Sequence, residues 1–288
     1  MRFVEDFTDY ELIDADCGER LERWGNIILI RPDPQVIWNS GKNDNRWESA
    51  AAVYHRSSTG GGYWEKKGYV PDVWQIGYGD LTFNLKPMGF KHTGLFPEQA
   101  VNWSFARKLI ENAKRPISVL NLFSYTGGAT VACLKSGASV THVDASRGMV
   151  SWAKENAVSS GVADRPVRWL VDDCMKFVKR EIRRGKKYDA IIMDPPSYGR
   201  GPSGEIWKLE TGLSELLNDT GSLLSDDPLF FMLNSYTGGL SHTILDYMVR
   251  TCVAPKGKGR VFTDEIGLKV TRKDIVLPCG NTTIWTRE

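Results

Sequence analysis

The sequence predicts an α/β protein: a doubly wound sheet with an antiparallel last strand, preceded by a small β-rich domain. Two observations support this class. From residue 96 onward, strand signals alternate with helical periodicity, as in a sheet that carries helices on both faces. The last two strand signals follow each other without a helix between them, which favours an antiparallel hairpin at the sheet edge. We place the domain boundary between residues 1–90 and 91–288.

The composition allows a sizeable core and excludes a broadly basic surface. Of the 288 residues, 41% are hydrophobic and 25% charged, and the formal net charge is +2. A nucleic-acid-binding face therefore has to come from local charge, for which residues 179–187 are a candidate and a solvated helix end is the simpler interpretation. Neither a signal peptide nor a membrane-spanning run is visible, so we expect a cytoplasmic protein, monomeric or homodimeric.

The cysteines are scattered along the chain. They are Cys17, Cys133, Cys174, Cys252 and Cys279. Because they form neither a Cys-x-x-Cys pair nor a cluster with histidines, we predict no metal site and no disulfide framework.

The first ninety residues have short apolar runs, such as residues 26–30, separated by the turn-rich stretches 39–45 and 58–62. Five tryptophans lie among them: Trp24, Trp38, Trp47, Trp64 and Trp74. Residues 76–86 alternate well enough for a hairpin strand. This pattern is typical of a small β-rich or α+β domain.

The second domain begins with a helix at 97–110, where Pro97 suits the first turn. We expect further helices at 128–135, 146–159, 174–184 and 241–252. The expected strands are 117–122, 139–143, 167–171, 188–193, 229–234, 260–270 and 281–286, with a long loop over 194–228. In such a sheet, ligands bind at the carboxyl ends of the strands.

The first of these strands runs into a glycine turn, Asn121-Leu-Phe-Ser-Tyr-Thr-Gly-Gly128. Gly127 and Gly128 lack a Cβ, so the backbone can turn sharply and approach a ligand closely. A plain turn is the alternative interpretation, and the stretch does not match Gly-x-Gly-x-x-Gly.

The next two strands end in carboxylates. Asp144 can accept hydrogen bonds from the vicinal hydroxyls of a ribose, because Ser146 is available to cap the following helix. His142 lies within the strand and is expected to be a packed core histidine. Of Asp172 and Asp173, we assign Asp173 to an adenine amino group and leave the other to cap a helix.

The sharpest signal is Asp194-Pro-Pro-Ser-Tyr198 directly after a buried strand. Two prolines fix the backbone and remove two N–H donors, so nearby carbonyls and the Asp194 carboxylate can face a substrate as rigid acceptors. Tyr198 offers an aromatic surface on which a base could stack. We therefore predict that Asp194, Pro195, Pro196 and Tyr198 form the catalytic group.

Together these stretches resemble class I S-adenosylmethionine-dependent methyltransferases. This resemblance implies a Rossmann-like sheet and S-adenosyl-L-methionine as cofactor, with S-adenosyl-L-homocysteine as product. More narrowly, the chain from Lys91 onward is similar to bacterial 23S rRNA methyltransferases acting on cytosine C5 or guanine N7. The segment Thr93–Gln99 is similar to that group's Thr-Gly-x-Phe-x-Asp/Glu-Gln. We expect no separate RNA-binding module of the PUA type.

The resemblance implies a cofactor pocket built from several loops. Its lining would include Phe96, Gln99, Phe123, Ser124, Thr126 and Gly127, with Asp144 on the ribose and Asp173 on the adenine. To these we add Asn121, Gly128, Ala145 and Asp194 from the same loops. The group's arginines after the glutamine are replaced here, where Ala100 and Trp103 follow Gln99. Contacts made by those arginines are not carried over.

A second departure concerns the mechanism. Cytosine-C5 transfer requires a thiolate that attacks C6 of the base. The cysteine would follow Pro195-Pro196 or lie at the end of the next strand, where this sequence has Ser197-Tyr198 and residues 234–237, Asn-Ser-Tyr-Thr. We interpret Cys174 as a buried packing residue and not as a nucleophile. We therefore expect direct transfer to a nitrogen or oxygen of a base.

The segment 199–210 follows the predicted catalytic turn, and we assign Arg200, Trp207 and Lys208 to substrate binding. A glycine-rich loop anchored by Trp207 is the alternative. We expect RNA as the partner and no membrane. The rival functions are a methyltransferase for a small molecule or protein, a nicotinamide-dependent oxidoreductase, and a non-catalytic RNA-binding relative.

Overall fold

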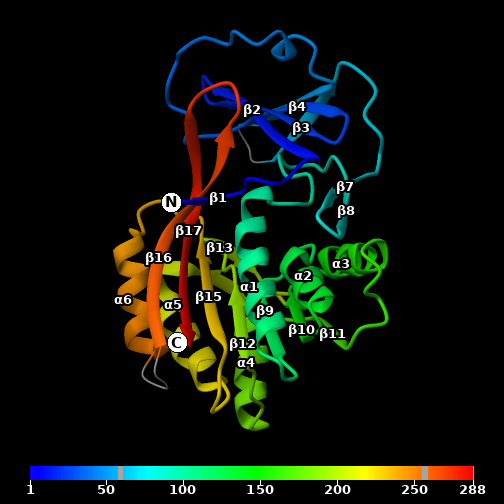
Figure 1. The fold of residues 1–288 in the computed structure, drawn as a ribbon. Helices are drawn as coiled ribbons and strands as arrows, with labels where there is room; N and C mark the ends of the chain where they lie inside the picture. The colour runs from blue at the N-terminus through cyan, green and yellow to red at the C-terminus, as the bar shows by residue number, and fades with distance from the viewer. Residues whose placement is uncertain (58–60, 255–258, 288) are drawn as a thin grey trace. The chain divides into compact units, whose positions relative to one another are not determined.

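The computed structural model describes residues 1–57, 61–254 and 259–287 (Figure 1). Its contacts divide the chain into two compact units. The large unit comprises Met1 and residues 101–266 and 280–288, and the small unit comprises residues 2–100 and 267–279.

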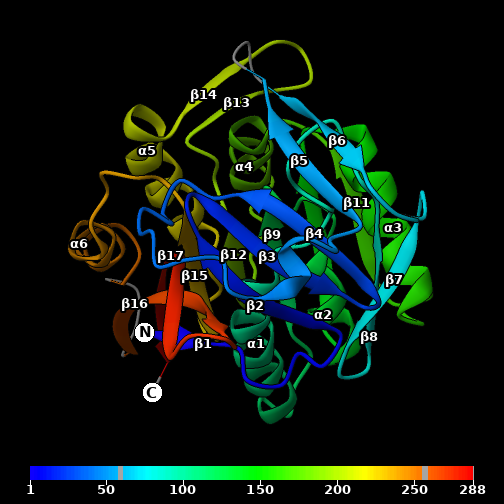
Figure 2. The same cartoon turned by 90° about the horizontal axis from the view of Figure 1, so that it is seen from above.

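The large unit is a doubly wound sheet with the strand order β11-β10-β9-β12-β15-β17-β16 (Figure 2). Its strands are β9 (Ser118–Leu122), β10 (Ser139–Asp144), β11 (Val167–Val171), β12 (Ala190–Met193), β15 (Phe230–Ser235), β16 (Gly259–Val270) and β17 (Ile275–Arg287). The first five strands of this order pair in parallel, whereas β15 and β17 are antiparallel. The predicted sheet with an antiparallel last strand is confirmed.

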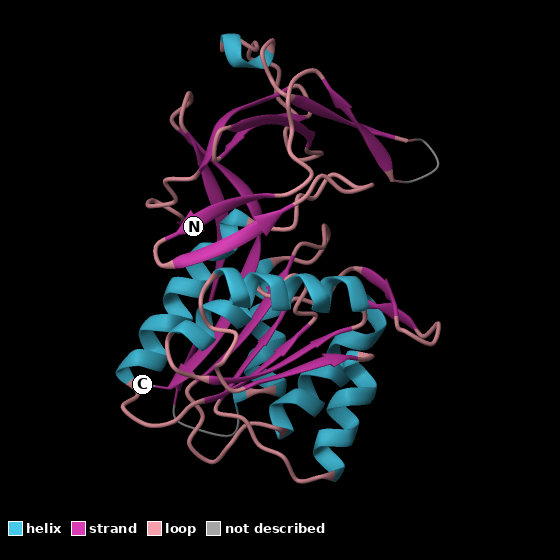
Figure 3. Ribbon diagram, turned by 90° about the vertical axis from the view of Figure 1, so that its right-hand side faces the viewer, coloured by secondary structure: helices cyan, strands magenta, loops and turns pink. Residues whose placement is uncertain are grey.

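Helices cover both faces of this sheet (Figure 3). They are α1 (Ala100–Asn112), α2 (Gly128–Lys135), α3 (Arg147–Ser159), α4 (Cys174–Arg183), α5 (Leu209–Ser222) and α6 (His242–Cys252), and α1 follows the 3-10 turn η2 (Pro97–Gln99). Helices α1–α3 lie on one face and α4–α6 on the other (Figure 2). The hydroxyl of Ser146 caps α3 as predicted, and Ser241 caps α6 in the same way. No helix among the described residues is both long and apolar enough to cross a bilayer.

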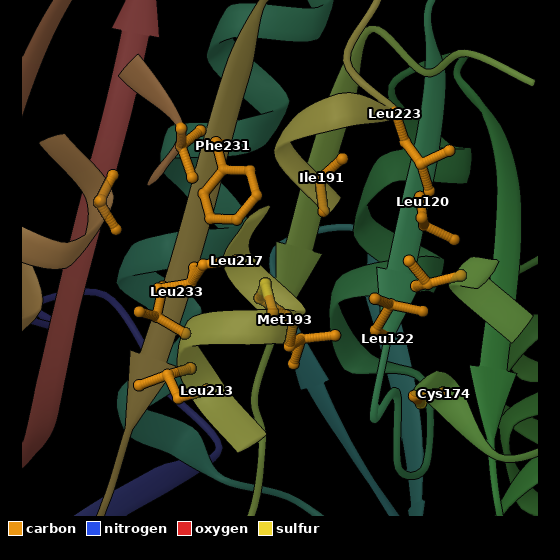
Figure 4. Close-up of a cluster of buried hydrophobic side chains, with 14 of the residues drawn as sticks. Leu120, Leu122, Cys174, Ile191, Met193, Leu213, Leu217, Leu223, Phe231 and Leu233 are labelled. Carbon is orange, nitrogen blue, oxygen red and sulfur yellow. The ribbon is translucent and has the colours of Figure 1, made fainter. Parts of the chain in front are cut away.

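The main core lies between the sheet and helices α4–α6. Figure 4 shows leucine, isoleucine, methionine and phenylalanine side chains of β9, β12 and β15 meeting those of α5. Because side chains alternate along β9, Leu120 and Leu122 point into this core. Asn121 between them points to the other face, where its side chain donates to Thr130 on α2. The end of β9 is therefore held by apolar packing on one face and by a hydrogen bond on the other.

The predicted loop over 194–228 is wrong. It contains β13 (Tyr198–Arg200), β14 (Ile206–Lys208) and the fourteen-residue helix α5. The buried residues Leu209, Leu213, Leu216, Leu217 and Thr220 follow helical spacing. The helix lacks a side-chain N-cap and contains Gly212, and both features weaken its signal in the sequence.

The small unit is built on strands in the order β16-β2-β3-β4-β5-β6, with a separate β7–β8 hairpin. Its strands are β1 (Arg2–Phe3), β2 (Tyr10–Asp16), β3 (Glu19–Trp24), β4 (Ile27–Pro32), β5 (Ala52–Arg56), β6 (Gly62–Lys66), β7 (Trp74–Tyr78) and β8 (Leu81–Leu85), and a 3-10 turn, η1, spans Asn45–Trp47. All neighbours from β2 to β6 are antiparallel except β4 and β5. The predicted β-rich character of the first region is confirmed.

The units separate after Ala100, and residues 267–279 belong to the small unit, whereas the sequence suggested a single cut at residue 90. Residues 267–279 are joined to the small unit by ion pairs at the β16–β17 turn. The Lys273 ammonium lies 2.8 Å from Asp14 and 2.9 Å from Asp16, both buried. Burial alone would raise the pKa of Asp16, but hydrogen bonds from Ser40, Cys17 and Lys273 hold it well below its usual value. Distant segments of the chain thus complete this unit.

Candidate functional site

The parallel strands of the large unit end at the same level of the sheet. Leu122 at the end of β9 is in register with Val143 and Met193, and Met193 is in register with Leu233. The residues that follow these strands therefore share one edge. The strand order reverses between β9 and β12, and a doubly wound sheet binds its ligand at such a point.

The loop after β9 has an unusual backbone. Phe123, Tyr125 and Gly127 all have positive φ, at 54°, 50° and 82°. Two of these residues carry a side chain, for which this conformation is strained, and such strain often marks a ligand site. A Cβ on Gly128 would lie 2.6 Å from the Trp103 ring, so the close approach of α1 requires glycine here. No local pattern in the sequence predicts this role for Trp103.

Two polar side chains predicted to line the cofactor pocket, Asn121 and Ser124, form hydrogen bonds beneath this loop. Asn121 Nδ2 donates to the Thr130 hydroxyl at 2.9 Å, and that hydroxyl lies 2.9 Å from Nδ1 of His142. Ser124 Oγ donates to Asn121 O at 2.7 Å. Asn121, Ser124 and Thr126 are all buried. The structure therefore places these side chains in the core, and His142 is the packed core histidine that we expected.

Asp144 bridges two loops through its carboxylate. Oδ2 accepts from the Tyr125 N–H at 2.8 Å, and Oδ1 accepts from the Ser146 N–H at 2.8 Å. Burial raises the pKa of Asp144, and these two backbone donors lower it by less. Each oxygen has a second lone pair beyond its backbone partner, so the carboxylate fits a pair of vicinal hydroxyls. Ala145 lies beside it, partly exposed.

Of the two acids after β11, Asp173 takes the capping role that we expected of Asp172. Asp173 caps α4, since its Oδ1 accepts from the Lys176 N–H at 2.8 Å. Asp172 pairs with Arg180. Only one Asp173 oxygen serves the cap, so an adenine contact by Asp173 stays a prediction.

The turn after β12 is stabilised by Trp207. The indole Nε1 of Trp207 donates to the Pro196 carbonyl at 2.6 Å. Its ring lies 5.4 Å from that of Phe123 and is 8% exposed. Trp207 therefore links the Pro-Pro turn to the loop after β9. It is buried as an anchor, and the Pro196 carbonyl already has a donor.

Strands β13 and β14 form a two-stranded ribbon directly after this turn. Tyr198 pairs with Lys208, and Arg200 pairs with Ile206. All four side chains are exposed, Tyr198 at 51% and Ile206 at 63%. Within the described part of the chain, no carboxylate pairs with Arg200 or Lys208. One face of the ribbon thus presents an aromatic ring between two unneutralised cations.

The two places where the resemblance puts a cysteine carry hydroxyls that contact each other. Ser197 Oγ lies 2.6 Å from the Thr237 Oγ1, which connects the loops after β12 and β15. Cys174 is 3% exposed, and its sulfur accepts from the Phe123 N–H at 3.4 Å. Burial is the main cause that raises the pKa of Cys174 well above its usual value. The Cys174 thiol is therefore a buried, protonated group that contacts the loop after β9.

Phe96 and Gln99 belong to the small unit, where Phe96 precedes η2 and its ring lies 5.0 Å from that of His92. Three of the six cations in the basic run 179–187 form ion pairs with described residues: Lys179 pairs with Glu215, Arg180 with Asp172 and Arg184 with Glu181. The solvated helix end, which was the simpler interpretation, fits these contacts. Among the described residues, no group of His, Cys, Asp and Glu is arranged to hold a metal.

A family model described as S-adenosylmethionine-dependent methyltransferase matches residues 53–228. A crystal structure of a SAM-dependent methyltransferase from Agrobacterium tumefaciens is 35% identical, with a TM-score of 0.94 over 99% of this chain and 93% of that one. A putative methyltransferase solved in complex with SAH shares the fold at 17% identity, with a TM-score of 0.73 over 98% of this chain and 76% of that one.

Curated relatives named ribosomal RNA large subunit methyltransferase K/L also match. The protein from Shewanella frigidimarina is 34% identical over 50% of this chain and 20% of its own length. The protein from Methylococcus capsulatus is 30% identical over 59% of this chain and 22% of its own. The chain thus spans about one fifth of the length of these relatives.

Proposed function

The chain belongs to the family of S-adenosylmethionine-dependent methyltransferases, and we propose that it methylates a nitrogen or oxygen of an RNA base by direct transfer. The observation that carries the choice of RNA is the exposed ribbon face beside the catalytic turn. An aromatic ring between two unpaired cations suits a base and its flanking phosphates. The curated relatives named for ribosomal RNA support the same acceptor.

We assign the cofactor to the loops after β9, β10 and β11. The carboxylate of Asp144 holds the ribose hydroxyls and that of Asp173 the adenine amino group. The strained loop from Phe123 to Gly128 brings the backbone close to the cofactor, with Ala145 beside the ribose. Asn121, Ser124 and Thr126 shape this loop from the core side. Phe96 and Gln99, which belong to the small unit, stay predictions from the resemblance. When bound, the cofactor supplies a methyl group activated by a sulfonium.

The loop after β12 positions the nucleophile. We propose that the Asp194 carboxylate and the Pro195 carbonyl accept hydrogen bonds from the acceptor group, so that its lone pair points along the line of attack. The Pro196 carbonyl is held by Trp207, which makes Trp207 a positioning residue. Tyr198 stacks on the base, and Arg200 and Lys208 contact phosphates. Because Trp207 is buried, we replace its predicted role in substrate binding by that of an anchor for the loop.

Direct transfer is supported by the residues at the two places where the resemblance puts a cysteine. Ser197 and Thr237 occupy the places considered for a cysteine, and neither hydroxyl can form a stable adduct with C6 of cytosine. Cys174 is buried and its pKa is raised, so it stays a thiol near neutral pH. We also propose that the protein is located in the cytoplasm, because its five cysteines are free thiols.

Calorimetry with S-adenosylhomocysteine and with NAD is the first test, and we expect binding of the former only. The second is transfer of a radiolabelled methyl group from S-adenosylmethionine to total RNA from a strain that lacks the gene. We expect label in RNA, and digestion to nucleosides should show it on a nitrogen or oxygen. Label on cytosine C5 would contradict direct transfer. Binding without labelled RNA would favour a small-molecule or protein acceptor over RNA.

A further inference from the structure

The segment between β8 and η2 is clamped by side chains that donate to its carbonyls. The donors are Tyr54 Oη to Gly89 O at 3.2 Å, Trp64 Nε1 to Met88 O at 2.9 Å and Arg31 Nη1 to Lys91 O at 3.0 Å. Because protein donors occupy these carbonyls, the loop has a fixed path within the small unit. It presents Phe90, which is 47% exposed, next to the half-buried Lys91.

Four cations of the small unit, Arg20, Arg31, Arg56 and Lys91, lie on or beside this loop. Arg31 donates to Lys91 O, and Arg20 is its cross-strand partner in β3. Arg56 lies on the same face of β5 as Tyr54, whose hydroxyl donates to Gly89 O. Two of them are neutralised, since Arg31 Nε lies 2.6 Å from Glu22 and Arg20 pairs with Asp33. The other two are not. Among the described residues, the Lys91 ammonium has one acceptor, the Pro32 carbonyl at 3.4 Å. No carboxylate of the described residues pairs with the exposed Arg56.

The pKa values of the groups on and beside this loop agree with an excess of positive charge there. Burial, then Arg20 and Arg31, lower the pKa of Lys91 to about 8, and Arg56 adds to this while Asp33 opposes it. Burial and the same cations lower the pKa of His92 to about 3, so His92 stays neutral. Burial also raises the pKa of Glu98, which weakens its use as a counter-charge. An anion at this place would remove an unfavourable repulsion.

We propose that Lys91 and Arg56 form a phosphate-binding site of the small unit, which takes a phosphodiester of the RNA substrate, with Phe90 placed to stack on an adjacent base. This assignment rests on the proposed RNA substrate. Two unpaired cations of different reach, one fixed by a clamped loop and one exposed, suit an anion that carries several acceptor oxygens. The site adds a second contact region for RNA, separate from the ribbon face in the large unit.

Salt-dependent binding of a labelled single-stranded RNA tests the site. Each phosphate contact contributes about 0.7 to the slope of log affinity against log salt for a single strand. We expect Lys91→Met and Arg56→Met each to lower the slope by about that amount and to weaken binding several-fold at low salt. Lys67→Met is the matched control, because Lys67 is an exposed lysine of the same unit outside the cluster. It should leave the slope much closer to that of the unmodified protein.

A second measurement follows Lys91 itself. In the protein with ¹³C-methylated lysines, its resonance should titrate near pH 8. Added RNA should move this titration to higher pH, since a nearby phosphate favours the ammonium. An unmoved titration together with unchanged slopes in both variants would overturn the site. If the unmodified protein binds no RNA at all, the proposed acceptor fails as well, so the two failures are distinguishable. Arg56 is exposed, and its variant keeps the test valid even if Lys91→Met does not fold.

Discussion

The loops on the two sides of the switch point between β9 and β12 differ in how their polar groups are used. On the β9–β10 side, Asn121, Ser124 and Asp144 all bond to neighbouring backbone or side chains. On the β12 side, Tyr198, Arg200 and Lys208 point to solvent from a short ribbon. The first side is built in advance of its ligand, and the second is left open for one.

This difference suits the cofactor and the proposed RNA acceptor. A cofactor of fixed shape gains affinity from a preorganised pocket, because little ordering remains to be done on binding. A polynucleotide brings its own charge and shape, and exposed cations and aromatic rings can adapt to it. Trp207 contacts both sides, since its ring packs against Phe123 and its N–H holds Pro196. Substitutions on the two sides should therefore cause separable defects, in cofactor binding on one side and in turnover on the other.

Asp194→Ala should give the largest defect, and it should fall on turnover. Losing the acceptor that orients the nucleophile costs about 10²–10³-fold in kcat, as for other preorganised polar groups. Steady-state kinetics with saturating RNA would show it, and calorimetry should find the affinity for S-adenosylhomocysteine much less affected. Asp194→Asn keeps one carbonyl acceptor and should retain more activity. Asp226→Ala, an exposed acid in the same unit, is the control.

Asp144→Ala should instead weaken the cofactor. We expect a loss of ~1.5–3 kcal/mol in the binding free energy of S-adenosylhomocysteine, from charged hydrogen bonds to the ribose. Calorimetry measures it directly, and Asp164→Ala, on an exposed loop of the same unit, should bind normally. Unchanged affinity in Asp144→Ala would remove Asp144 from the site.

The same carboxylate should make cofactor binding depend on pH. Burial raises the pKa of Asp144 in the free protein, and ribose donors stabilise the ionised form, so bound cofactor lowers that pKa again. The affinity for the cofactor is therefore highest above the raised pKa of Asp144, and it declines as the pH falls through that pKa. Asp144→Asn should flatten this decline. A decline that persists in Asp144→Asn would point to another group.

Trp207→Phe should produce a smaller effect that separates turnover from binding. The ring is kept against Phe123, but the donor to the Pro196 carbonyl is lost. A hydrogen bond of about 1 kcal/mol corresponds to about a fivefold loss of kcat, with cofactor affinity nearly unchanged. Trp38→Phe loses a comparable donor, to Ala15 O at 2.7 Å in the small unit, and should leave kcat as it is. Equal losses in both variants would mean that the effect is general destabilisation.

Periodicity and strand-end residues predicted most of the large unit. The helix 128–135 and the strand 167–171 agree with α2 and β11, and Ser146 caps α3 as expected. Such local signals suffice where one element buries one apolar face. They failed at α5, whose leucines have helical spacing but whose ends lack capping signals.

The direction of individual side chains was harder to predict. Trp207 could equally have anchored the loop or faced a substrate, and only the pairing of β13 with β14 turns it inward while Tyr198 and Lys208 face out. The assignment of residues 267–279 to the small unit depends on Lys273 reaching Asp14 and Asp16, more than 250 residues away in the chain. Contacts between such distant segments leave no local pattern in a single sequence.

The smallest effect is expected from Cys174→Ser, because the comparison assigns this thiol to the rigid side of the site. Serine keeps an acceptor for the Phe123 N–H, so kcat and cofactor affinity should stay within about threefold, with a stability loss of about 1 kcal/mol in urea unfolding. Cys133→Ser, at an equally buried sulfur, should lose similar stability. If Cys174→Ser abolished transfer while the fold and S-adenosylhomocysteine binding were intact, the thiol would have to act as a nucleophile. That would require it to leave the core, where burial now keeps it protonated.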